Sequence, residues 1–471
     1  MMIRRLLLPM TLIALAGCTV GPDYQGPPQV AAPSLAAGRL PHAPLALPTA
    51  PAPARWWQAL GDAQLDALID TALTSSPDLA SAEARLRQSR AGLHSEQASG
   101  RPKVDAGATL LRMRSPNTSA LGYDSGRGPL SLYLASFDAS WEVDLFGGTR
   151  RAVEAASASA DASAAQLADS QVRLAAEVVQ AYVDLRDRQA RLALVEASAA
   201  TEDQALDLTQ QRRARGVASQ LQLEQVLTQA DTTRARRLPL QAEIIQALDQ
   251  LAALSGLAPG ELDARLAAPQ PLPQVPATVP LADPAALLKA RPDVRVAERQ
   301  LASSQARIGE QTAGWFPKLS LYGSLGFSAG DPSHLARSDN ATWLAVPRLT
   351  WNALDFGRVA ASVNSAEAGR DEALAHYQAV VLEALRDADT ALARYGHQRE
   401  NVVLLRDIEA SATRAASLTG QRYRAGTAST LDWLDAERTR FEAEQNRIAG
   451  DAQLLKDFTS LHKALGLGWA L

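Results

Sequence analysis

The sequence of 471 residues has few cysteines, little excess charge and a low mean hydropathy, and each of these features excludes a class of protein. It contains one cysteine, which rules out an intramolecular disulfide and any zinc cluster built on cysteines. Its 47 basic and 51 acidic residues give a formal net charge of −4, which argues against a nucleic-acid-binding protein. A mean hydropathy of −0.13 excludes a polytopic helical membrane protein. It does not exclude a membrane β-barrel, whose strands are only half apolar.

Signatures of catalysis are also scarce. The six histidines are scattered without HExxH spacing, and no phosphate-binding GxxxxGK[ST] pattern occurs. Residues Ser460–Lys463 match SxxK, but they lie in a helical pattern without the companion motifs, so chance explains the match. We therefore expect that the protein is not an enzyme and that it uses no cofactor or metal.

The N-terminus has the pattern of a lipoprotein leader. Two arginines precede a short apolar stretch (6–16), which is too brief to span a bilayer as a helix, and small residues lead to Cys18. This resembles the bacterial lipoprotein signal, which implies a signal peptide over 1–17 and a covalent lipid on Cys18. By the same resemblance, Thr19 favours the outer membrane. The alternative is an ordinary secretory signal with an incidental cysteine.

Residues 18–54 predict a lipid-anchored linker. Nine prolines lie between Pro22 and Pro53, among alanine and glutamine. Such a composition disfavours both helix and sheet, so we expect a semi-extended tether that leads from the lipid to the folded part of the chain.

The rest of the chain consists of two internal repeats, over 55–258 and 281–471, with a proline-containing connector over 259–280. Pro77-Asp78 recurs 215 residues later as Pro292-Asp293. From Trp141, which matches Trp351, the offset is 210. The offset between matching residues changes only once, by five residues, over the whole length of the two copies. This indicates an internal duplication.

Each copy contains two stretches in which apolar and polar residues alternate. They predict strands over 103–112, 130–145, 318–328 and 342–352. Each is close to the ~9–11 residues that a tilted strand needs to cross an outer membrane. Strands of this kind are equally compatible with two soluble hairpins packed on helices, because the membrane signal of each strand is weak.

Each copy also predicts two long helices, over 149–215, 219–256, 358–425 and 429–466. In the 358–425 helix, apolar residues recur at alternating steps of three and four, which is the spacing of coiled-coil packing. The helices are joined by near-identical turns. Gly216 and Gly426 suit the left-handed residue that ends a helix, and Ser219 and Ser429 suit N-caps that form capping boxes with the residues three positions on.

Four stretches of the chain resemble TolC-like outer-membrane efflux proteins of the OprM/NodT type: Gly17–Tyr24, Trp141–Gly147, Pro317–Leu321 and Lys463–Trp469. The likeness covers nearly the whole mature chain, duplication included. It implies a mainly α protein with membrane β, in which a homotrimer shares one twelve-stranded outer-membrane barrel that continues into a long periplasmic α-helical barrel. By strand arithmetic alone a dimer with eight strands remains possible, because four strands cannot close a barrel.

The resemblance also implies a function. It is the exit duct of a tripartite efflux pump for small molecules such as drugs, which works with a periplasmic adaptor and an inner-membrane pump of the resistance-nodulation-division type. Two alternatives stay open, a type I protein-secretion channel and a periplasmic structural or adaptor coiled-coil lipoprotein. The sequence does not name the substrate.

The resemblance also implies roles for residues near the two turns, at positions that match functional residues of the family. Leu431 and Asp435 match an apolar and an acidic constriction ring, and Asp432 matches a second acidic position, although capping explains Asp432 equally well. Residues that tie neighbouring helices in the closed state correspond to Arg422, Tyr423 and Gln222. Residues that dock the adaptor correspond to Arg212, Gly216, Ser219, Arg422, Gly426 and Ser429.

Overall fold

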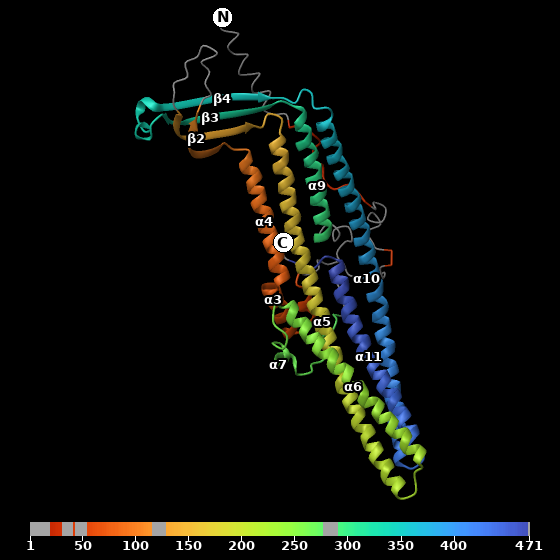
Figure 1. Cartoon of the computed structure of the whole chain (residues 1–471). Coiled ribbons are helices and arrows are strands. Elements are labelled where there is room, and N and C mark those ends of the chain that lie inside the picture. The colour runs from red at the N-terminus through yellow and green to blue at the C-terminus, as the bar shows by residue number, and fades with distance from the viewer. Residues whose placement is uncertain (1–18, 31–40, 43–53, 115–128, 277–290, 470–471) are drawn as a thin grey trace. The chain divides into compact units, whose positions relative to one another are not determined.

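The computed structural model describes residues 19–30, 41–42, 54–114, 129–276 and 291–469 (Figure 1). The predicted signal peptide and Cys18 lie outside these residues. The chain forms two compact units. Both contain segments from both sequence repeats. Among the described residues, one unit is formed by 19–28, 85–114, 129–163 and 296–377, and the other by 29–30, 41–42, 54–84, 164–276, 291–295 and 378–469. The repeats are therefore not separate domains, because each packs with the other.

The first unit contains a four-stranded antiparallel sheet in the order β1-β2-β3-β4 (Figure 1). Its strands are β1 (Lys103–Met113), β2 (Leu130–Val143), β3 (Lys318–Ala329) and β4 (Ala341–Thr350). β2 and β4 end two residues before the expected 145 and 352. After β2 the reason is clear, because the Asp144 carboxylate accepts hydrogen bonds from the first amides of the following helix, at 2.9 and 3.2 Å.

The strand register shows that the duplication extends to the hydrogen-bonding pattern. In the first hairpin Lys103 lies opposite Ser140, and in the second Lys318 lies opposite Thr350. The offsets of 215 and 210 convert one pair into the other. The five-residue change of offset therefore lies in the connections between the strands, 114–129 in the first repeat and 330–340 in the second.

The helices repeat in the same way. The two longest, α5 (Gly148–Ala214) and α10 (Arg358–Arg424), have 67 residues each, about 100 Å of helix at 1.5 Å per residue. They are followed by α6 (Gln220–Leu254) and α11 (Thr430–Ala464), of 35 residues each. The remaining helices within the described residues are α3 (Ala63–Ser75), α4 (Pro77–Ser99), α7 (Asp263–Leu266), α9 (Pro292–Thr312) and the short 3₁₀ helices η2 (Trp56–Leu60), η4 (Ala313–Trp315), η5 (Pro332–His334) and η6 (Ser338–Asn340).

The beginning of the predicted linker is not a free tether. The amide of Val20 donates to the carbonyl of Phe146 at 3.1 Å, and the guanidinium of Arg151 donates to the carbonyls of Val20 and Gly21 at 3.1 and 3.2 Å. Gly21 has φ +87°, and a Cβ there would lie 2.3 Å from the Cα of Gly309. Two glycines thus allow this segment to lie directly on a helix, which fixes the residues that follow Cys18.

The core of the second unit is rich in aromatic side chains. Trp56 and Trp57 are 1% exposed and their rings meet edge to face. The ring of His462 stacks on Trp56 with centroids 4.9 Å apart and also contacts Phe458. The Nδ1 atom of His462 lies 2.8 Å from the carbonyl oxygen of Phe458. This core joins the N-terminal 3₁₀ helix η2 to the last helix, α11.

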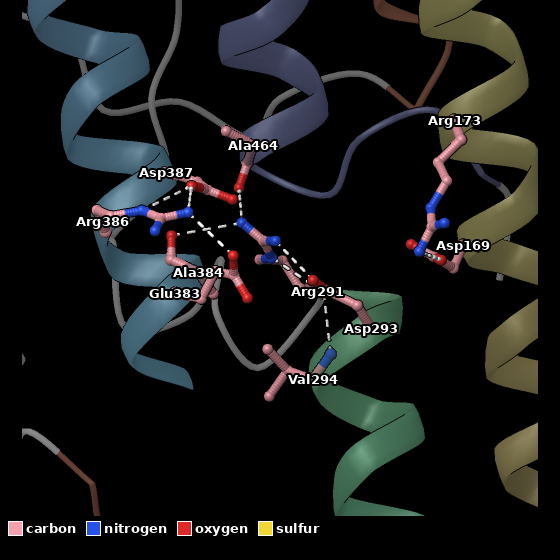
Figure 2. Close-up of polar contacts among 10 residues, drawn as sticks. All are labelled: Asp169, Arg173, Arg291, Asp293, Val294, Glu383, Ala384, Arg386, Asp387 and Ala464. Carbon is pink, nitrogen blue, oxygen red and sulfur yellow. Dashed lines mark hydrogen bonds and ion pairs between the residues drawn. The ribbon is translucent and has the colours of Figure 1, made fainter. Parts of the chain in front are cut away.

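Two buried charged side chains of the same unit, Arg291 and Asp169, each pair with an opposite charge, as Figure 2 shows. The guanidinium of Arg291 donates to the carbonyl of Ala464 at 2.6 Å and pairs with Asp293 at 2.6 Å. Burial by itself would raise the pKa of Asp293, but the hydrogen bonds and charge of Arg291 outweigh it and hold this pKa below its usual range. Asp169 pairs with Arg173 at 2.5 Å, yet burial still raises the pKa of Asp169. Arg291 thereby ties the start of α9 to the end of α11.

Candidate functional site: the two helical turns

The turns that join α5 to α6 and α10 to α11 have the same backbone. Gly216 and Gly426 both have φ +75°. In each turn the amide that follows the glycine donates at 2.9 Å to a carbonyl five residues earlier, that of Arg212 or Arg422. Both glycines have open space around a would-be Cβ. The sequence predicted these turns, and the duplication makes them equivalent.

Both predicted capping boxes are present. The hydroxyl of Ser219 accepts from the amide of Gln222 at 3.2 Å, and the side-chain oxygen of Gln222 accepts from the amide of Ser219 at 2.9 Å. In the second turn Ser429 and Asp432 make the same two bonds at 3.0 and 2.9 Å. The hydrogen bond from the Ser429 amide lowers the pKa of Asp432, which is therefore ionised at neutral pH. Capping thus engages one oxygen of this carboxylate.

The two residues matched to constriction rings lie on one face of α11, four positions apart. Leu431 is partly buried against a small apolar cluster that includes Leu434. Asp435 is exposed, and one of its oxygens lies 2.5 Å from the guanidinium of Arg438. A ring needs several copies of the chain, so the role of these two residues in a constriction stays a prediction.

Two contacts at the turns involve residues that the sequence analysis did not single out. The ring of Tyr423 stacks on Trp433, with centroids 5.1 Å apart and planes 8° apart. The guanidinium of Arg212 donates to the hydroxyl of Thr430 at 3.3 Å, which links the two turns. Comparison of the repeats could not find Trp433, because its counterpart is Leu223. Since Gln222 is engaged in its own cap, the predicted tie between Tyr423 and Gln222 stays a prediction.

The described residues give little indication of a catalytic or metal-binding site. A GxSxG pattern runs from Gly326 to Gly330, but Ser328 lies in the ladder of β3 opposite Leu134, not on the strand-to-helix turn that exposes a nucleophile. Across the described ranges, no group of three or more histidine, cysteine, aspartate or glutamate side chains is placed to hold a metal ion. Nor does any helix in those ranges have both the length and the apolar character required to cross a membrane.

Solved structures with the same fold define the class of protein. The outer-membrane channel OprN matches with a TM-score of 0.87 and 34% identity over 96% of this chain and all of that chain. The open state of the MtrE outer-membrane channel of Neisseria gonorrhoeae matches with a TM-score of 0.82, 26% identity and coverage of 96% and 98%. The fold is thus that of outer-membrane channels, as the sequence predicted.

Sequence relatives define the family. The antibiotic efflux pump outer membrane protein ArpC of Pseudomonas putida is 32% identical, over 98% of this chain and 95% of that protein. OprJ of Pseudomonas aeruginosa is 30% identical, over 97% and 94%. The model of the outer membrane efflux protein family matches residues 68–257 and 284–467. The chain belongs to this family, which confirms the predicted family and outer-membrane location; the family is one of channels, not of enzymes.

Proposed function

We propose that this protein is the exit duct of a tripartite efflux pump that moves small molecules across the outer membrane. The observation that carries the proposal is the match over nearly the full length to efflux-pump outer membrane proteins, among them ArpC. The sheet supports it: four strands are too few for a barrel, the smallest of which have about eight, and open edges are not tolerated in lipid. We therefore propose a homotrimer, with the lipid on Cys18 as its anchor.

The partners follow from the turns. The side chains of Arg212 and Arg422 are exposed, and so are the capping serines. We propose that both turns dock a periplasmic adaptor, and that engagement of the adaptor and of an inner-membrane pump of the resistance-nodulation-division type opens the duct. Because the two turns share one backbone geometry, each chain offers two equivalent docking positions.

The test of this function is the behaviour of the purified full-length protein in planar bilayers. We expect ion-conducting pores, a mass of three subunits by native mass spectrometry in detergent, and restored antibiotic resistance in a strain that lacks its own efflux channel. A monomer that forms no pores would contradict the proposal. Pores that restore export of a secreted protein but not antibiotic resistance would favour the secretion channel.

The proposed constriction makes a second prediction. Replacing both Leu431 and Asp435 with alanine should raise the resting single-channel conductance several-fold, because the change removes an apolar ring that disfavours continuous water and a ring of carboxylates. The matched control is Asp231→Ala, since Asp231 pairs with Arg234 three residues on, just as Asp435 pairs with Arg438. Equal currents in the double variant, the control and the wild type would show that these residues do not form the constriction.

A further inference from the structure

An aromatic pair joins the two helices of the second turn. We infer that Trp433 is a positioning residue for the constriction, which acts by stacking on Tyr423 and thereby fixes the rotation of α11 relative to α10. This contact directs Leu431 and Asp435 towards the pore at rest. The role rests on the proposed function, in which these two residues form the constriction. Neither the duplication nor the resemblance to the family assigns it.

The stack connects the last turn of α10 to the first turn of α11. The rings of Tyr423 and Trp433 are 8° from parallel and their centroids lie 5.1 Å apart, within the range in which aromatic pairs stabilise each other. Both side chains are half-buried. Trp433 also packs against the small apolar cluster that holds Leu434 of α11 and Val226 of α6. The indole therefore holds the start of α11 both to α10 and to a helix of the first repeat.

Helix α10 leaves room for the indole beside the tyrosine. A Cβ at Gly420 would lie 3.5 Å from the Nε1 atom of Trp433, so the indole lies close to the backbone of α10 there. Gly420 and Tyr423 are three residues apart and therefore share one face of this helix. The first repeat lacks all three residues, whose counterparts are Gln210, Arg213 and Leu223. The three positions thus differ together between the copies, as expected of residues that serve one contact.

The position of Trp433 on α11 explains how the stack acts on the constriction. Leu431 and Asp435 are four positions apart and share one face of α11, whereas Trp433 is two positions from each and lies on another face. A rotation of α11 about its own axis would therefore slide the indole off the ring of Tyr423 as it turned the constriction residues away from the pore. The loss of the stack opposes this rotation, so the stack favours the closed state.

Single-channel recording of the full-length protein in planar bilayers tests this role. Trp433→Leu gives the second turn the residue of the first, and it should raise the resting open probability by about two- to tenfold, the range that corresponds to the free energy of one aromatic pair. The conductance of the fully open state should stay unchanged, because Leu431 and Asp435 are still present. The matched control is Leu223→Ala, since Leu223 packs against the same apolar cluster but stacks on no ring. Its open probability should equal that of the wild type.

Further variants separate the stack from a tie made by the tyrosine hydroxyl. Tyr423→Leu should have the same effect as Trp433→Leu, and the double variant should add nothing, because all three lose one and the same contact. Tyr423→Phe keeps the ring and removes only the hydroxyl, so it should raise the open probability less than Tyr423→Leu does. Trp433→Phe keeps an aromatic ring and should restore most of the wild-type behaviour.

Several results would overturn the role of Trp433. They are an open probability of Trp433→Leu equal to that of the wild type, additive effects of Trp433→Leu and Tyr423→Leu, or an effect of Tyr423→Phe as large as that of Tyr423→Leu. A melting temperature that falls while the open probability stays constant would show that the stack only stabilises the fold. A conducting wild type with an insensitive Trp433 refutes this role alone, whereas a wild type without pores refutes the proposed function as well.

Discussion

Replacing Gly256 with alanine should lower the melting temperature of the purified protein far more than replacing Gly216 with alanine. Both glycines end a long helix in the left-handed region, with φ +70° and +75°. For any other residue this conformation costs about 1–2 kcal/mol. At Gly216 nothing lies within 4 Å of an added Cβ, so this cost is the whole effect. At Gly256 the Cβ would lie 2.3 Å from the carbonyl oxygen of Ser75, so backbone must move as well.

We therefore expect Gly256→Ala to cost about 3 kcal/mol or more. The duplication supplies a second matched pair, Gly466→Ala and Gly426→Ala, because a Cβ at Gly466 would lie 2.9 Å from the Cα of Arg291 while Gly426 has open space. Thermal unfolding followed by circular dichroism in detergent measures all four variants. Equal shifts within each pair would show that the close approach of backbone contributes nothing.

Acidification from about pH 6.5 to about pH 4 should destabilise the protein through His462. Burial lowers the pKa of His462 from 6.5 to about 4, because its ring is enclosed by Trp56 and Phe458 and its 3% exposure leaves no room for water. In the unfolded chain the same imidazole takes up a proton at its ordinary pKa. Stability is therefore fully present above pH 6.5 and falls as the pH drops towards 4, by up to about 3 kcal/mol.

The variant His462→Gln removes this titration while keeping a hydrogen-bonding side chain of similar length. Melting temperatures measured between pH 7 and pH 4 should fall less in the variant than in the wild type. Buried carboxyl groups such as Asp169, whose pKa is raised by burial, titrate in both proteins and cancel in the comparison. The control is His376→Gln, at an exposed position of α10. A variant that loses stability on acidification as steeply as the wild type would show that His462 does not carry the effect.

Periodicity and repetition predicted most of the fold. The strands could be found because alternation is a local signal, and the turn at Gly216 could be found because its chemistry recurs at Gly426. Helices α6 and α11 end two residues before the expected 256 and 466, because Gly256 and Gly466 take the left-handed conformation beyond them.

Contacts between segments far apart in the sequence could not be predicted. Residues 19–24 lie in the segment 18–54 that was expected to be a semi-extended tether, since a glycine- and proline-containing stretch has no period. The close approach of Gly21 to Gly309 depends on a helix almost 300 residues away. The stacking of Tyr423 on Trp433 could not be predicted for a different reason, because neither ring has an aromatic counterpart in the first repeat. The division into two compact units could not be predicted either, because each unit is formed from segments of both repeats.

The five-residue difference between the copies shows where this chain could change in evolution. Five residues added to a long helix would turn everything beyond them by about 140° and carry side chains such as Leu194 away from the cluster that buries them. Added to a strand, an odd number would exchange its two faces. In the connections 114–129 and 330–340 the same change disturbs neither phase. The two copies can therefore differ in length between their paired strands, while their helices and strands keep the phase that packing requires.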